Sequence, residues 1–187
     1  MRNQMAGIVL AGGAARRMSG VDKPMLEVGG MPLLRRAISA LRGVSPVIVV
    51  GPRRAGLPPV TWTREEPPGG GPVAGLAAGL ALVPPGKDLV VVLAADLPGL
   101  RPSTVDKLVA ALGAADGAVL VDADGKRQWL IGAWRTARLR AALPSSPGGV
   151  SMRKLLGGLS TVTVGEAPGE SADVDTPADL ERHAGRL

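Results

Sequence analysis

The chain has 187 residues, a formal net charge of +6 at pH 7, no cysteine and one histidine, His183. Without cysteine there is no disulfide framework or thiolate metal site, and one histidine near the C-terminal end argues against histidine-based catalysis. Tyrosine and phenylalanine are absent and only three tryptophans are present, so stacking on nucleic-acid bases has almost no aromatic material. The basic residues are scattered or lie beside glycines, which favours an anionic small molecule over a nucleic acid as the ligand.

The size of the chain suits one domain with a continuous core, so we expect residues 1–187 to form a single domain. No internal repeat and no linker divides it. The apolar run Ile8–Leu10 is too short for a signal sequence or a membrane span, so we expect a cytoplasmic protein that does not bind membranes.

Apolar runs bounded by glycine and proline alternate along the chain with stretches of helical periodicity. The pattern predicts strands at Met5–Leu10, Val47–Val50, Val60–Thr63, Leu89–Ala94, Ala118–Asp122, Leu130–Trp134 and Thr161–Val164. It predicts helices at Pro32–Leu41, Val73–Leu82, Ser103–Leu112, Thr136–Leu143 and Met152–Leu156, and a last helix from Thr176. This order predicts a Rossmann-like, three-layer α/β/α fold with a mostly parallel sheet, in which Leu130–Trp134 is an antiparallel strand.

A phosphate-binding segment follows the first strand. Its paired glycines, Gly12 and Gly13, expose backbone N–H groups and let a polyanion approach the main chain. Arg16, Arg17 and Lys23 supply positive charge, although only one of the adjacent arginines needs to face the ligand and Arg16 equally suits a solvated position. The combination indicates a nucleoside triphosphate.

Two common nucleotide motifs are excluded by spacing. A dinucleotide fingerprint needs G-x-G-x-x-G and an acidic residue at the end of the second strand, where this chain has Val50-Gly51-Pro52. A P-loop needs Gly-Lys-Ser/Thr, whereas here Gly20 precedes Val21-Asp22-Lys23-Pro24.

Acidic residues follow two of the predicted elements. The strand Leu89–Ala94 is the most apolar segment, as expected of a central parallel strand, and it delivers Asp96 to its C-terminal edge. Asp96 also suits a turn before Pro98. Asp173 and Asp175 precede the last predicted helix, where aspartate equally suits a helix N-terminus.

The pattern Leu-Ala-Gly-Gly-x-x-x-Arg-Met-x-x-x-Asp-Lys-Pro resembles the signature of the MobA-like NTP transferases, which attach a nucleoside monophosphate to a phosphorylated small molecule. Three further segments resemble this family in the same order: Gly71-Pro72-Val73-Ala74-Gly75, Ala95-Asp96-Leu97-Pro98 and Asp173-Val174-Asp175-Thr176-Pro177-Ala178-Asp179-Leu180. Together they cover almost the entire chain. The resemblance implies the fold of the nucleotide-diphospho-sugar transferases.

Within the family the chain is most similar to the molybdenum cofactor guanylyltransferases, which transfer GMP from GTP to molybdopterin and release pyrophosphate. The resemblance implies that base and phosphates are held by the backbone of Leu10, Ala11, Gly12 and Gly13. Arg17 and Lys23 would neutralise the triphosphate and the leaving pyrophosphate, because nucleotidyl transfer needs positioning and charge stabilisation rather than a covalent nucleophile. Asp96 would bind Mg²⁺, with Asp175 as the candidate second carboxylate.

The resemblance also places an acidic residue near the nucleotide base, at Glu65, or at Glu66 if the loop alignment shifts by one. A carboxylate there would accept hydrogen bonds from guanine, although charged residues in such a loop are commonly just solvated. The loop Pro144–Gly149 and the Arg153-Lys154 pair suit either a second phosphorylated ligand or a mobile surface.

Two departures keep the base and the acceptor open. The family tends to carry asparagine where this chain has Gly51, and Asp173 and Asp175 stand where it tends to carry asparagines. A cytidylyltransferase or a sugar-phosphate nucleotidyltransferase of the same fold is therefore the alternative. A catalytically inactive nucleotide-binding partner in cofactor delivery is the alternative of another class. We expect a monomer or a weak homo-oligomer.

Overall fold

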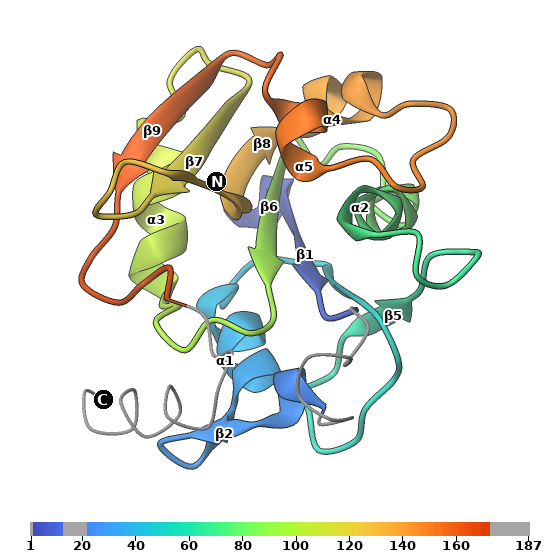
Figure 1. The fold of residues 1–187 in the computed structure, drawn as a ribbon, viewed down its shortest axis with the longest axis vertical. Coiled ribbons are helices and arrows are strands. Elements are labelled where there is room, and N and C mark those ends of the chain that lie inside the picture. Colours follow the sequence, from blue (N-terminus) through green and yellow to red (C-terminus); the bar gives the residue numbers. More distant parts are fainter. Residues whose placement is uncertain (1, 13–21, 173–187) are drawn as a thin grey trace.

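The structure, a computed structural model, describes residues 2–12 and 22–172. They form a seven-stranded sheet in the order β5-β4-β1-β6-β8-β7-β9 (Figure 1). Its strands are β1 (Met5–Leu10), β4 (Val47–Val50), β5 (Thr61–Thr63), β6 (Leu89–Ala94), β7 (Gly117–Val121), β8 (Arg127–Arg135) and β9 (Thr161–Gly165). β8 is antiparallel to both of its neighbours, and the other neighbouring pairs in this sheet are parallel. The predicted mostly parallel α/β fold is confirmed, including the antiparallel return strand.

Helices cover both faces of the sheet (Figure 1). They are α1 (Leu33–Ala40), α2 (Pro72–Ala81), α3 (Pro102–Ala111), α4 (Thr136–Ala142) and α5 (Met152–Leu156). Apolar residues of α1 and α3 pack in one buried cluster with Val9, Val49 and Val91. Those of α2, α4 and α5 pack in a second cluster with Ile8 and Ile48. Because successive strand residues point to opposite faces, the five inner strands β4, β1, β6, β8 and β7 each supply both clusters, and three layers result.

The centre of the sheet is the pair β1 and β6. Their register runs from Met5 beside Leu89 to Leu10 beside Ala94, so the two strands end side by side. Val90 to Ala94 are buried, because helices cover both faces of β6. The bounds of β1, β4 and β6 are those predicted, since unbroken apolar runs define these strands, and the predicted bounds of α5 are confirmed as well.

Two features depart from the predicted elements. β8 begins at Arg127 rather than Leu130, because Gln128 and Arg127 pair with Leu120 and Val121 of β7 even though they are polar. A small antiparallel hairpin, β2 (Glu27–Val28) with β3 (Met31–Pro32), was not predicted, because two-residue strands are too short to show a period. The other elements differ from the prediction by a residue or so at their ends.

Two short 3-10 helices, η1 (Arg2–Gln4) and η3 (Lys23–Met25), complete the described secondary structure. The last predicted helix, from Thr176, lies outside the described residues. Within residues 2–12 and 22–172, no helix combines the length and apolarity needed to cross a membrane.

Candidate functional site

Four neighbouring parallel strands, β5, β4, β1 and β6, end at one edge of the sheet. Leu10 lies between Val50 and Ala94, and the main chain continues this alignment beyond the strands. The Ala11 N–H donates to the Val50 carbonyl at 2.8 Å, and the Ala95 N–H donates to the Leu10 carbonyl at 3.1 Å. The residues that follow the strands are therefore neighbours, at the edge where open α/β sheets bind ligands.

Gly51 follows β4 and lies against the glycine-rich segment. A Cβ atom added to Gly51 would lie 2.7 Å from the Ala11 carbonyl oxygen and 3.0 Å from the Gly12 nitrogen. The φ of Gly51 is +148°, which side-chain-bearing residues rarely adopt. Glycine at this position therefore lets two strand ends approach each other more closely than any other residue would.

Lys23 and Asp96 come together across this edge. Lys23 begins η3, Asp96 follows β6, and the Lys23 ammonium lies 3.7 Å from Asp96 Oδ2. Their side chains are 21 % and 35 % exposed, respectively, so solvent reaches both. The two predicted charged groups thus form an open ion pair at the end of the central strands.

Glu65, one of the two glutamates that the resemblance places near the base, lies beside Gly12. Both carboxylate oxygens of Glu65 lie within about 4 Å of the position a Cβ on Gly12 would take, at 3.9 and 4.0 Å. Glu65 is half-buried and Oε1 accepts a hydrogen bond from the Gly69 N–H at 3.0 Å. Glu66 is exposed. The geometry therefore selects Glu65 over Glu66 as the carboxylate nearest the glycine-rich segment.

The loop before α2 touches the C-terminal half of the chain. The Gly149 N–H donates to the Gly70 carbonyl at 2.9 Å. The loop predicted at Pro144–Gly149 thus packs against the loop that Glu65 braces. Arg153 and Lys154 are exposed on α5, which contacts α2.

An ion pair that was not predicted from the sequence joins two parts of the site. The Arg54 guanidinium donates from Nε and Nη2 to the two carboxylate oxygens of Asp22, both at 2.7 Å. Arg54 Nη2 also donates to the Ala11 carbonyl at 3.2 Å. The available signal was weak: Asp22 precedes Lys23 in the signature, whereas Arg54 lies in an irregular loop where arginine is usually solvated.

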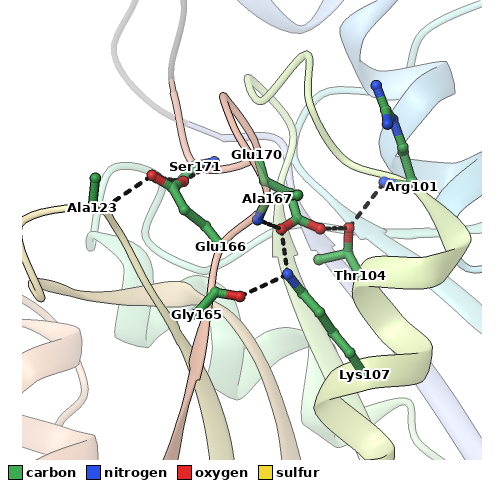
Figure 2. A network of polar contacts seen from close by, with 9 residues as sticks. All are labelled: Arg101, Thr104, Lys107, Ala123, Gly165, Glu166, Ala167, Glu170 and Ser171. Atoms are coloured by element: carbon green, nitrogen blue, oxygen red, sulfur yellow. Dashed lines mark hydrogen bonds and ion pairs between the residues drawn. The ribbon is translucent and has the colours of Figure 1, made fainter.

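Figure 2 shows a second polar network, which joins α3 to the segment after β9. The Glu170 carboxylate accepts hydrogen bonds from the Thr104 hydroxyl, the Lys107 ammonium and, at 2.7 Å, the Ala167 N–H (Figure 2). The Arg101 N–H donates to Thr104 Oγ1 at 3.2 Å, which ties the start of α3 to this carboxylate. Burial alone would raise the pKa of Glu170, but these hydrogen bonds outweigh it and hold the pKa below the ordinary value.

This network fixes the segment after β9 against the loop after β6. A Cβ added to Gly99 would lie 2.2 Å from the Gly169 carbonyl oxygen and 2.6 Å from Glu170 Cα. Glu166 accepts from the Ser171 N–H at 2.9 Å and from the Ala123 N–H at 3.1 Å, which adds the β7–β8 turn (Figure 2). The loop that begins at Asp96 is therefore packed, at Gly99, against the segment that contains Gly169 and Glu170.

Several predicted site residues lie outside the described residues: Gly13, Arg17 and Asp175, together with Arg16 and Asp173. Among residues 2–12 and 22–172, no group of three or more acidic, histidine or cysteine side chains gathers as a metal site. Mg²⁺ is commonly held by one or two carboxylates, with waters and phosphate oxygens as the other ligands. The partly exposed Asp96 carboxylate at the end of β6 fits that arrangement.

Two solved structures illustrate the proteins that share this fold. One is molybdopterin-guanine dinucleotide biosynthesis protein A from Archaeoglobus fulgidus, with a TM-score of 0.72 and 19 % identity over 97 % of this chain and 98 % of that one. Another is 2-C-methyl-D-erythritol 4-phosphate cytidylyltransferase from Thermus thermophilus, with a TM-score of 0.74 and 19 % identity over 96 % of this chain and 98 % of that one. The fold is thus that of the nucleotidyltransferases.

Sequence similarity identifies the family. The model of the MobA-like NTP transferase domain matches residues 7–163. The molybdenum cofactor guanylyltransferase of Rhodobacter capsulatus is 33 % identical over 98 % of this chain and 97 % of its own. The chain belongs to the MobA-like NTP transferase family.

Proposed function

We propose that the protein is a molybdenum cofactor guanylyltransferase, which transfers GMP from GTP to molybdopterin and releases pyrophosphate. The observation that carries the proposal is the nearly full-length similarity to the Rhodobacter capsulatus enzyme, together with the Lys23–Asp96 pair at the end of the central strands. We take residues 1–187 as one catalytic domain, of which the family match spans residues 7–163.

In this proposal a phosphate oxygen of the acceptor attacks the α-phosphorus of GTP. The new P–O bond forms as the bond to the β-phosphate oxygen breaks, and pyrophosphate leaves with the electron pair. Such transfer depends on in-line positioning and charge stabilisation. Lys23 stabilises the charge on the leaving pyrophosphate, as does Arg17, which lies outside the described residues.

The nucleotide would lie over the ends of β1 and β4. The backbone of Leu10, Ala11 and Gly12 contacts it, with Gly13 continuing the same segment. Glu65 faces this backbone and accepts hydrogen bonds from guanine N1–H and the exocyclic amine, a donor pair that cytosine does not present. Asp96 would hold Mg²⁺, with Asp175 as the proposed second ligand, and a bound ion would neutralise negative charge on the phosphate oxygens.

The test is incubation of the purified protein with Mg²⁺, molybdopterin and each of the nucleoside triphosphates in turn. We expect pyrophosphate release with GTP above the other three, and a dinucleotide product of the matching mass. Preference for CTP would contradict the guanine assignment and favour the cytidylyltransferase alternative, for which Asp173 and Asp175 argue. If none of the four nucleoside triphosphates yields pyrophosphate, the inactive nucleotide-binding alternative is favoured.

A further inference from the structure

The Arg54 side chain makes an unusually complete set of contacts for an arginine in a surface connection. It lies between β4 and β5, three residues after Gly51, and its side chain is 10 % exposed. Nε and Nη2 bind both oxygens of Asp22, Nη2 also reaches the Ala11 carbonyl, and Nη1 donates to the Pro52 carbonyl at 3.1 Å. Each of the three guanidinium nitrogens is therefore engaged.

These contacts join the two ends of the phosphate-binding signature. Ala11 lies at the end of β1, and Asp22 immediately precedes Lys23. The Met25 N–H donates to the Asp22 carbonyl at 2.9 Å, so fixing Asp22 also fixes the start of η3. A planar fork on a carboxylate fixes direction as well as distance, which a lysine ammonium does not.

We propose that Arg54 is a positioning residue, which through Asp22 sets where the Lys23 ammonium meets the triphosphate. The inference rests on the proposed function, in that the anion bound at Lys23 is the polyphosphate of a nucleotide. Arg54 itself spends its donors on the protein, so it acts through the placement of Lys23 rather than by binding phosphate.

A positioning role and a purely electrostatic role predict different effects of two substitutions on anion binding. Asp22→Asn removes a negative charge beside Lys23, so a purely electrostatic role predicts stronger anion binding. Arg54→Lys keeps the positive charge, so a purely electrostatic role predicts no change. A positioning role predicts weaker binding in both variants, because each removes the two-point contact.

The measurement is calorimetric binding of inorganic tripolyphosphate to the full chain. We expect Arg54→Lys and Asp22→Asn each to weaken binding about tenfold, the loss typical of one charged hydrogen bond. The double variant should bind within about twofold of either single variant, because both remove the same contact. Arg53→Lys is the matched control, since Arg53 is exposed, and it should bind as the wild type does.

Chemical rescue of an Arg54 variant provides a second readout, because a cavity of about 370 Å³, lined by residues 53–60 and Trp62, lies beside Arg54. In Arg54→Ala, guanidinium ion at a low, non-denaturing concentration should enter through this cavity and restore part of the binding. Sodium chloride at equal ionic strength should not. Loss of thermal stability alone would not produce such rescue.

Three results would overturn the proposal: unchanged binding by Arg54→Lys, stronger binding by Asp22→Asn, or additive losses in the double variant. Failure of the wild type to bind tripolyphosphate would also overturn it. Because this measurement needs neither a base nor turnover, it is independent of the guanylyltransferase assignment. A wild type that binds tripolyphosphate but releases no pyrophosphate from any nucleotide would refute the proposed function alone.

Discussion

Two lysine–carboxylate pairs, Lys23–Asp96 and Lys107–Glu170, differ in how many contacts the carboxylate makes with the protein. Asp96 lies 3.7 Å from Lys23 and its side chain is 35 % exposed, and none of the described residues donates a hydrogen bond to it within the usual distance. Glu170 is 5 % exposed and accepts from Lys107, Thr104 and the Ala167 N–H. The Glu170 carboxylate accepts hydrogen bonds from three protein donors, whereas the Asp96 carboxylate has acceptor sites available to a ligand. The difference separates a carboxylate that the protein itself engages from one that is available to a ligand, although both are paired with a lysine.

The largest expected effect is that of Asp96→Asn. Turnover should fall by about 10²–10³-fold or more, because the substitution removes a charge aimed at the reacting phosphates. The unfolding temperature should change little, since the partly exposed Asp96 carboxylate makes only a long ion pair with Lys23. Pyrophosphate release measures the loss of turnover, and thermal denaturation of the same preparation measures the unfolding temperature. Turnover near that of the wild type would rule out the role assigned to Asp96.

Lys23→Met should come next, with kcat/KM for GTP reduced by about 10²-fold through lost stabilisation of the leaving pyrophosphate. Lys107→Met is the matched variant in the other pair. It should keep kcat/KM within a few-fold and instead lower stability, because it leaves the buried Glu170 carboxylate without its cation. Steady-state kinetics and urea denaturation of both variants make the comparison. Equal losses of kcat/KM in Lys23→Met and Lys107→Met would contradict the different roles assigned to the two ion pairs.

Glu170→Gln should lower the free energy of unfolding by about 1–3 kcal/mol, because a buried acceptor of charged hydrogen bonds is replaced by a neutral amide. The exposed Glu27 provides the control, and Glu27→Gln should stay within about 0.5 kcal/mol of the wild type. Chemical denaturation at neutral pH measures both. The folded Glu170→Gln protein should keep most of its activity.

The smallest expected effect is the pH dependence of stability. The folded-state pKa of Glu170 is lowered from its ordinary value of 4.5, so the unfolded chain takes up a proton first as the pH falls. The stabilisation is therefore complete above about pH 5 and is lost as the pH falls through the folded-state pKa. Asp116, whose pKa is lowered by hydrogen bonds from Arg138 and the Ser160 N–H, contributes in the same direction.

Because Asp116 is present in both proteins, the difference between the wild type and Glu170→Gln isolates Glu170. Denaturation curves between pH 3 and pH 7 should converge toward the acid end. Parallel curves over this range would show that the Glu170 network does not depend on ionisation.

The strands and helices could be predicted from the sequence because their cause is local. A run such as Leu89–Ala94 defines a buried strand without knowledge of its neighbours, and the confirmed bounds of β1, β4 and β6 follow from the same kind of run. The β2–β3 hairpin could not be predicted, because its strands are two residues long. Periodicity needs more residues than that to be visible.

The site residues also differ in whether a local sequence signal indicates them. Lys23, Asp96 and Gly12 could be proposed for the site from the sequence because they belong to motifs or follow apolar strands. The Arg54–Asp22 pair was missed because its partners are 32 residues apart and one lies in an irregular loop. Glu170 was missed because a glutamate between glycine and serine normally faces solvent, and only the folded chain brings Thr104 and Lys107 to it.

Gly51 has a consequence for redesign of base preference. The residue type that the family tends to carry here could not be introduced by a single exchange, since any side chain at residue 51 would meet the Ala11 backbone 2.7 Å away. A graft of asparagine would have to be accompanied by a shift of the β1 terminus, and with it of the Arg54 contact to Ala11. Directed evolution that starts from this chain should therefore reach new base selectivity through Glu65 and its loop, and libraries fixed at residue 51 would lose little.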